Sequence, residues 1–358
     1  MLIAQAAMKI IVLGGSGFIG RHVCEKLAAA GHSITVPTRR LSSAKHLQHL
    51  PRLQLLQCNA HDSVQLQHAV AGHDVLVNLI AVLHGDEDRF NTVHVQLPQT
   101  IANACRAAGV PRIVHISALG AALDAPSLYQ RSKARGEAVL TASGLDVRML
   151  RPSVVFGAED KLLNLFASLQ KIAPFMPLAG ADTQFQPVWV EDVAQAVVQL
   201  ATDNRLPVLD RSSSAQATPA ATTPKAASAP ASPATAPVQS TRPVAAAHHA
   251  IFEACGPQVL TLREIVALAG RCVGAERPIF ALPAGLANVQ AWVMERLPGE
   301  PLMSRDNLAS MRVPNIASGT LPGLAELGIT AASMSTIAPT YLGAARTLDD
   351  YRKEVGLS

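Results

Sequence analysis

Residues 8–23 read MKIIVLGGSGFIGRHV, an apolar run that breaks into glycines and then resumes with a helical pattern. The β-branched residues before the glycines predict a strand, and those after them predict a helix from Gly20 to Ala30 that Gly31 ends. A strand, a glycine turn and a helix in this order are the opening unit of a dinucleotide-binding sheet. The stretch therefore decides the fold and gives the first candidate site.

Three spaced glycines have separate duties in such a turn. Gly14 permits the tight turn off the strand, Gly17 lets the backbone approach a pyrophosphate, and Gly20 allows the helix to pack closely on the strand. The N–H groups and the positive end of the helix favour an anion. An ordinary glycine-rich turn is the alternative, which the flanking strand and helix disfavour. The predicted cofactor-binding loop comprises Gly14, Gly15, Ser16, Gly17, Phe18, Ile19 and Gly20.

The residues after the second predicted strand, 33–36, distinguish between the two nicotinamide dinucleotides. An NAD site uses an acidic residue there to bind the ribose 2′-hydroxyl, but no acidic residue lies between Glu25 and Asp62. Arg39 and Arg40 occupy the position instead, and a guanidinium group suits a 2′-phosphate. A solvated pair of loop arginines is the alternative. The sequence therefore favours NADP(H) over NAD(H).

Strands and helices continue to alternate along the chain, which predicts right-handed βα units and a doubly wound parallel sheet of the Rossmann type, in the α/β class. Residues 8–150 form the predicted dinucleotide-binding domain, while 151–205 and 250–345 supply its remaining elements and a smaller C-terminal α/β lobe. Further strands are expected at 53–57, 74–80, 112–117, 146–150 and 249–253, and helices at 63–70, 92–108, 129–142 and, in the lobe, 261–269.

A stretch of different composition interrupts this pattern at 211–249. Ala, Pro, Ser and Thr fill 30 of its 39 positions, and it has no aromatic residue. Such a stretch cannot bury enough apolar surface to offset the entropy of ordering it, so we expect a disordered insertion. A docking segment for a partner is the alternative.

One predicted helix of the lobe, 284–297, carries Leu286, Val289, Val293 and Leu297 along one side. This stripe predicts packing against the dinucleotide-binding domain. The alternative is a helix that docks on a membrane surface or a protein complex, for which Arg296 is the helix's only basic residue.

Composition limits the other functions that the chain could have. The 358 residues carry 30 Lys and Arg against 26 Asp and Glu, a formal charge of +4 that is spread along the chain, so no nucleic-acid footprint appears. Five cysteines without a Cys-x-x-Cys motif predict buried reduced thiols, and the twelve histidines lack metal-ligand spacing. No convincing targeting segment or membrane span is found, Met1–Ala7 looks dispensable before Met8, and a cytoplasmic protein is expected.

Three residues could carry chemistry. Tyr129 and Lys133 lie four residues apart on one predicted helix face, where an ammonium group can act on a phenol. Ser117 ends a predicted strand at the edge of the sheet where ligands bind. Tyr129 could exchange a proton with a carbonyl or hydroxyl while a nicotinamide carries the hydride. A chance spacing, with Tyr129 only packing on a loop, is the alternative.

These motifs together resemble the extended short-chain dehydrogenase/reductase superfamily, of the NAD-dependent epimerase/dehydratase type. The stretch 151–160, RPSVVFGAED, with 186–194 and 256–262, is similar to an atypical branch that includes the nucleotide-binding accessory subunit of respiratory complex I and its bacterial homologues. The likeness covers most of residues 8–205 and 250–345.

This resemblance implies a Rossmann core that holds NADPH, with Lys133 also positioning the nicotinamide ribose. It departs from the wider superfamily at Cys58 and Asn59, where relatives often carry a Gly-Asp pair, so Asn59 would contact the adenine as an amide. Two functions remain open. One is an oxidoreductase or epimerase/dehydratase acting through Ser117, Tyr129 and Lys133 on an unidentified small molecule. The other is a non-catalytic NADPH-holding accessory or assembly protein of a respiratory or ubiquinone-pathway complex, peripheral to the inner membrane.

Overall fold

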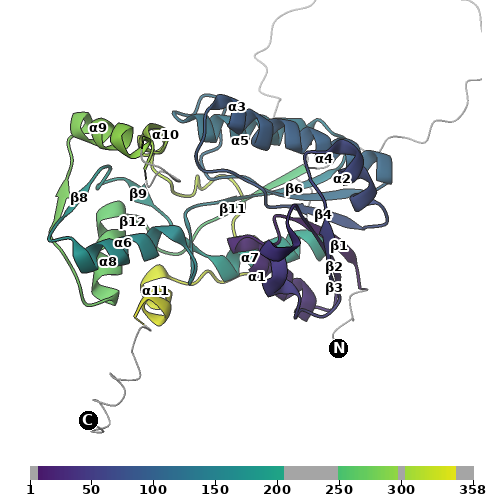
Figure 1. Cartoon of the computed structure of the whole chain (residues 1–358), viewed down its shortest axis with the longest axis horizontal. Helices are drawn as coiled ribbons and strands as arrows, with labels where there is room; N and C mark the ends of the chain where they lie inside the picture. Colours follow the sequence, from purple (N-terminus) through teal and green to yellow (C-terminus); the bar gives the residue numbers. More distant parts are fainter. Residues whose placement is uncertain (1–6, 205–248, 297–302, 344–358) are drawn as a thin grey trace, which may run out of the picture.

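The computed structural model describes residues 7–204, 249–296 and 303–343, which form a large sheet domain and a smaller lobe beside it (Figure 1). Most of the predicted insertion at 211–249, most of Met1–Ala7 and the expected helix end at Leu297 lie outside these ranges. Within them, no helix is long and apolar enough to cross a membrane.

A seven-stranded parallel sheet forms the core of the large domain, in the order β11-β6-β5-β4-β1-β2-β3. The order reverses at β1, as in a doubly wound sheet, so the predicted Rossmann-type fold is confirmed. Ligands bind such sheets in the crevice beside the reversal, at the carboxyl ends of the strands. The strands are β1 (Lys9–Leu13), β2 (Ser33–Thr38), β3 (Leu53–Gln57), β4 (Val75–Asn78), β5 (Arg112–Ile116), β6 (Asp146–Pro152) and β11 (His249–Ala254).

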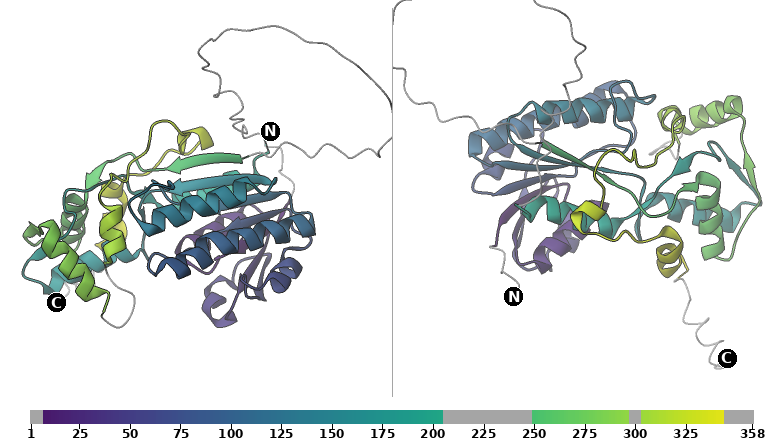
Figure 2. Two further views of the ribbon diagram at one scale, coloured as in Figure 1. Left: turned by 90° about the horizontal axis from the view of Figure 1, so that it is seen from above. Right: turned by 180° about the vertical axis from the view of Figure 1, so that it is seen from behind.

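Helices cover both faces of the sheet, as Figures 1 and 2 show. Alternate residues of β1 enter opposite cores: Ile10 and Val12 pack toward α1 and α7, whereas Ile11 and Leu13 pack toward α2 and α4. Both faces of β1 are therefore buried, which explains why its residues are apolar without alternation. The helices are α1 (Phe18–Ala29) and α7 (Val190–Thr202) on one face, and α2 (Ser63–Val70), α3 (Glu87–Asn91), α4 (Leu97–Ala108) and α5 (Leu128–Thr141) on the other.

The smaller lobe has its own apolar core, built from three helices and short strand pairs. Phe156, Phe166, Ile265 and Met334 are buried in it. Its helices are α6 (Lys161–Ile172), α8 (Leu262–Cys272), α9 (Ala284–Met294), α10 (Arg305–Ser310) and α11 (Met334–Leu342). The strand pairs are β8 (Met176–Leu178) with β13 (Ile279–Ala281), β9 (Gln184–Phe185) with β12 (Leu260–Thr261), and β7 (Val155–Phe156) with β10 (Val188–Trp189). Short 3₁₀ turns occur at Leu41–Leu47 and Ala325–Leu327.

Two sequence predictions need correction. The helix expected at 92–108 begins earlier, with α3, and passes through a π-helical segment, Thr92–Gln96, before α4. The expected side of the helix at 284–297 is wrong, because among the described side chains of α9 the buried ones are Ala287 and Ala291, while Leu286 and Val289 are exposed. The apolar stripe predicts which side of the helix is buried. In the structure, however, the neighbouring elements contact the side that carries the small residues.

Gly20→Ala is expected to destabilise the ligand-free protein by about 2 kcal/mol or more, because its Cβ would overlap the Gly14 carbonyl oxygen and lie 2.6 Å from Gly15 Cα. Gly17→Ala is the matched control, since the nearest atom to its Cβ is the Gly14 oxygen at 3.3 Å. Urea unfolding of the two variants measures the difference. Equal losses would show that the close approach at Gly20 does not limit the fold.

Candidate functional site

The glycine loop between β1 and α1 opens the crevice at the carboxyl edge of the sheet. Gly14 has φ +79°, and its carbonyl accepts a hydrogen bond from the Gly17 N–H at 3.0 Å. Gly17 is the N-cap of α1, and neither a side-chain cap nor an acidic residue occupies the first turn of that helix. The positive end of α1 is therefore available to an anionic group, as the predicted cofactor loop requires.

The loops after β2 and β3 form one side of this crevice. Arg39 and Arg40 are exposed, and neither guanidinium group makes a hydrogen bond or ion pair to any described residue. Burial, and then the charge of Arg39, lowers the pKa of His61 in the next loop, so the two loops lie close together. The Oδ1 of Asn59 accepts the His61 N–H at 3.2 Å, which fixes the turn around the predicted adenine contact.

Ser117 and Lys133 are brought together at the end of β5. Lys133 is only 1% exposed, and its Nζ donates to the carbonyl of Ile116, the residue before Ser117, at 3.0 Å. Burial lowers the pKa of Lys133 to about 8, and the nearby Glu137 carboxylate partly opposes this shift. The Ser117 Oγ is buried and has no hydrogen-bond partner among the described residues. A buried hydroxyl without a protein partner is costly, and this one is free to bond to a bound molecule.

Tyr129 lies one turn before Lys133 on α5, against an aromatic wall. Its ring makes edge contacts with His94 and Phe90, at centroid distances of 5.5 Å and 6.1 Å. No described hydrogen bond joins it to Ser117 or Lys133. Burial raises the pKa of Tyr129 to about 12, the opposite of the direction that a neighbouring ammonium group was expected to give. The phenol is therefore protonated at neutral pH in this state.

An acid of the smaller lobe holds the helix that carries Tyr129. The carboxylate of Asp306, in α10, accepts the Leu128 N–H at 2.6 Å and the Tyr129 N–H at 3.0 Å. Ser127 caps the same end by accepting the Gln130 N–H. Sequence reasoning missed Asp306, because 177 residues separate it from Tyr129 and no local pattern links them.

A buried histidine supports Tyr129 from the π-helical segment. The Nε2 of His94 accepts the Val82 N–H at 3.2 Å, so its Nδ1 carries the proton and donates to Ser132 Oγ at 2.8 Å. That hydroxyl donates to the Tyr129 carbonyl. Burial, with smaller contributions from Lys133 and then His115, lowers the pKa of His94 to about 2. His94 is therefore a neutral positioning group.

A second neutral histidine, His115, lies near the end of β5, beside the end of β4. His115 pairs in register with Asn78, whose Nδ2 donates to His115 Nδ1 at 3.0 Å. Burial and the Lys133 charge lower the pKa of His115 to about 3, and its Nε2 has no partner among the described residues. Sequence reasoning missed both residues, although polar side chains inside an apolar strand were a usable signal.

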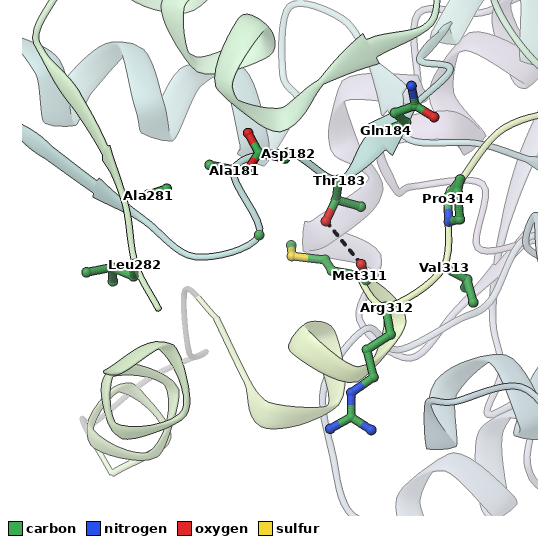
Figure 3. A pocket seen from close by; sticks show the side chains of 11 residues that line it. Ala181, Asp182, Thr183, Gln184, Ala281, Leu282, Met311, Arg312, Val313 and Pro314 are labelled. Atoms are coloured by element: carbon green, nitrogen blue, oxygen red, sulfur yellow. Dashed lines mark hydrogen bonds between the residues drawn. The ribbon is translucent and has the colours of Figure 1, made fainter. Parts of the chain in front are cut away.

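A returning segment after α10 crosses the carboxyl edge of the sheet and borders a pocket. Asn315 accepts a hydrogen bond from Ser153 Oγ at 2.6 Å and donates to the Leu119 carbonyl at 3.4 Å. The pocket, of about 380 Å³, lies in the smaller lobe between 180–184, 281–282 and 311–314 (Figure 3). None of Ser117, Tyr129 and Lys133 lines it.

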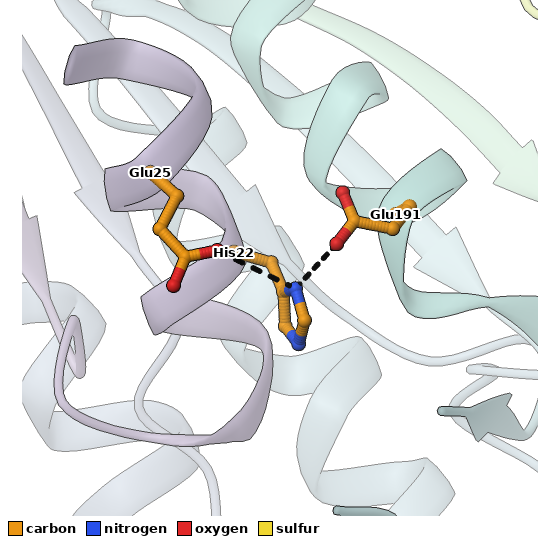
Figure 4. Close-up of side chains that lie close together, drawn as sticks. All are labelled: His22, Glu25 and Glu191. Atoms are coloured by element: carbon orange, nitrogen blue, oxygen red, sulfur yellow. Dashed lines mark hydrogen bonds and ion pairs between the residues drawn. The ribbon is translucent and has the colours of Figure 1, made fainter. Parts of the chain in front are cut away.

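A separate charged cluster joins α1 to α7 (Figure 4). His22, Glu25 and Glu191 offer ligand atoms within 4.8 Å of one another. The Glu191 carboxylate already binds His22 Nδ1 at 2.6 Å and Lys26 Nζ at 2.7 Å. These contacts explain the cluster as a link between the helices. Elsewhere, Cys24, Cys58 and Cys105 are buried and Cys255 and Cys272 half-buried, and all five are free thiols.

Replacing the buried amine Lys133 with Met should change how stability depends on pH. Between about pH 8 and 10.5 the unfolded chain still holds a proton that folded Lys133 has released, so this group makes stability rise with pH. The stability of wild type relative to Lys133→Met should rise by up to about 1.4 kcal/mol per pH unit in this window. Urea unfolding of both ligand-free proteins measures it, and the buried thiols cancel in the comparison. Parallel pH curves would contradict the lowered pKa.

Comparison with known proteins supports the expected resemblance. A mitochondrial NADH dehydrogenase (ubiquinone) 1 alpha subcomplex subunit 9 from Mus musculus is 35% identical over 201 residues, which are 54% of this chain and 52% of the mouse protein. The chain thus spans about half the length of the curated relatives it matches first. The mitochondrial NADH-ubiquinone oxidoreductase 40 kDa subunit of Neurospora crassa is 24% identical over 340 residues, 94% of this chain and 79% of that protein.

Solved structures agree on the fold. The UDP-glucose 4-epimerase of Thermus thermophilus, in complex with NAD, superimposes with a TM-score of 0.61 at 17% identity, over 94% of this chain and all of that one. At this identity the match concerns the fold alone. The model of the family described as NAD(P)H-binding matches residues 14–204, which include the glycine loop, Ser117, Tyr129 and Lys133. More than half of the chain is matched, and the protein therefore belongs to this NAD(P)H-binding family.

Proposed function

We propose that the protein is an NADP(H)-dependent oxidoreductase, or an enzyme of the related epimerase/dehydratase chemistry. The observation that carries this proposal is the buried Ser117 hydroxyl, which has no partner among the described residues and directly follows Ile116, whose carbonyl holds the Lys133 ammonium group at the carboxyl edge of the sheet. A solely structural serine and lysine at this edge would be expected to satisfy their hydrogen bonds within the protein.

The site fits a dinucleotide. The uncapped end of α1 would hold the pyrophosphate, Arg39 and Arg40 the 2′-phosphate, and Asn59 the adenine. A bound nicotinamide would supply or accept the hydride. The preference for NADP(H) over NAD(H) rests on these two arginines alone, and it is therefore part of the proposal.

The chain's own groups would handle the substrate oxygen. Ser117 would donate a hydrogen bond to a carbonyl oxygen, which draws electron density from the carbon that is reduced. Tyr129, whose phenol is protonated at neutral pH, would donate the proton that the reductive direction requires. Lys133 would hold a positive charge near the phenolate that forms and would position the nicotinamide ribose. His94 and Asp306 would keep the Tyr129 backbone in place.

A second candidate function is favoured by one observation, the match along 94% of this chain to a subunit of a mitochondrial NADH-ubiquinone oxidoreductase. In this alternative the protein holds NADPH as a structural ligand and acts in assembly or maintenance of a respiratory or ubiquinone-pathway complex, at the periphery of the inner membrane. The two candidates differ in whether Tyr129 must transfer a proton.

Replacing Arg39 and Arg40 together with Ala should reduce the affinity for NADPH and leave that for NADH unchanged. Each charge-assisted bond to the phosphate contributes about 1.5–3 kcal/mol, so at least a tenfold loss is expected. Lys45→Ala is the control, because it removes an exposed charge from the turn that follows. Titration calorimetry with both dinucleotides is the measurement. A wild-type protein with equal affinities would contradict NADP(H) preference.

Tyr129→Phe should separate the two candidate functions, because it keeps the packing on His94 and removes the proton donor. In an enzyme the rate should fall by about 10²–10⁴-fold while NADPH still binds. Complementation of a deletion strain, scored by quinone content and complex I activity, is the measurement.

Tyr341→Phe is the matched control, since that hydroxyl donates to Asp160 in the smaller lobe. Full rescue by Tyr129→Phe would exclude the catalytic function and leave the accessory one. Loss of rescue with intact NADPH binding would exclude a role that consists only of holding the nucleotide.

A further inference from the structure

Helix α9 exposes three large apolar side chains, Leu286, Val289 and Trp292. Ala287 and Ala291, four residues apart, are 5% and 0% exposed and form its packed side. Leu286 and Val289 are each 59% exposed, and Trp292 is 44% exposed. A surface helix normally buries its large apolar residues and exposes its polar ones. Among the described side chains of α9 the buried ones are alanines and the large apolar ones are exposed, which is typical of a surface that contacts something other than water.

Further large apolar side chains are exposed on other elements of the same lobe. Phe175 and Phe280 are more than half exposed and lie edge to face, with ring centroids 6.0 Å apart. Phe280 projects outward from β13, while Met176 and Leu178 of the paired strand β8 are buried. Ile172, at the end of α6, is 81% exposed. Figure 1 shows β8 and α9 at the end of the lobe farthest from the large sheet. We call this surface the apolar end face, comprising Ile172, Phe175, Phe280, Leu286, Val289 and Trp292.

Basic side chains without acidic partners border the apolar end face. The Arg296 guanidinium lies 3.7 Å from the centroid of the Trp292 ring. Lys171 precedes Ile172, and Arg277 precedes the strand of Phe280. None of the three has a carboxylate within ion-pair distance in the described ranges. The apolar side chains are therefore accompanied by positive charge.

Glu276 and Glu295, the described acidic residues that flank α9 and β13 in the sequence, are both paired. The Glu295 carboxylate accepts both the backbone N–H and the Nε of Arg305, at 2.7 Å and 2.9 Å. Glu276 pairs with Arg271 at 3.3 Å. The uncompensated charge around the apolar end face is therefore positive within the described residues, and it complements an anionic surface.

We propose that the apolar end face docks the protein on an anionic lipid surface. Leu286, Val289 and Trp292 would enter the boundary between headgroups and acyl chains, and Arg296 would stay at the level of the phosphates. A second copy is disfavoured as the occupant, because a two-fold contact would gather six uncompensated cations in one interface. The proposal deepens the membrane-peripheral location suggested above and does not depend on the chemistry of Tyr129.

Co-sedimentation of the full chain with lipid vesicles tests the proposal. Wild type should bind vesicles that contain phosphatidylglycerol, bind phosphatidylcholine vesicles far less, and dissociate at high salt. Arg296→Glu should weaken binding at least about fivefold, and the pair Leu286→Ser with Val289→Ser should abolish most of it. Val64→Ser is the matched control, because Val64 is 61% exposed on α2 of the large domain. In a Trp189→Phe background, Trp292 emission should shift to the blue on binding.

Folding and function are checked separately in each variant. Urea midpoints and NADPH binding should match wild type, so a loss of vesicle binding reports the surface alone, and a failure of nucleotide binding bears only on the proposed function. Equal sedimentation of wild type and the surface variants would overturn the proposal. So would wild type that ignores anionic vesicles, or that forms a dimer which Leu286→Ser with Val289→Ser dissociates.

Discussion

The burial of one positive charge, on Lys133, organises much of the molecule. An ammonium group that is almost fully withdrawn from water costs several kcal/mol unless hydrogen bonds and opposite charge compensate it. The Ile116 carbonyl supplies a bond from the end of β5, and Glu137, one turn further along α5, supplies the charge. Glu137 in turn binds Arg151 on β6 at 2.8 Å.

This arrangement ties one helix to two adjacent strands and extends further. Arg151 also lies in the field of Glu253 on β11, whose carboxylate accepts the N–H and hydroxyl of Ser318. Alternating charges therefore run from α5 across the sheet edge to the segment that returns from the smaller lobe. The candidate site takes its geometry from the same groups, since Ser117 follows the residue that holds the amine. The contact that stabilises the Lys133 charge thus also holds the backbone next to Ser117.

The parts of the molecule that were predictable from sequence are those with local causes. The glycine loop could be predicted because turn, helix start and close packing follow from residues within one short stretch, and the alternation of strands and helices gave the sheet. The partners of Tyr129 could not be predicted, since Asp306 and His94 reach it only through tertiary packing. The side of α9 that is buried was also unpredictable, because tertiary contacts bury Ala287 and Ala291 and leave the stripe of Leu286 and Val289 exposed. The exact roles of Ser117, Tyr129 and Lys133 stay predictions.

The carboxylate of Asp306 on the first N–H groups of α5 has a consequence for modularity. The nucleotide-binding half does not complete its own helix, because the end of α5 is closed by an acid that the chain supplies after it has built most of the smaller lobe. A truncated first half would leave those N–H groups without this partner, next to Tyr129. The two halves therefore share the start of α5, and a substitution of Asp306 in α10 changes the end of a helix in the other half.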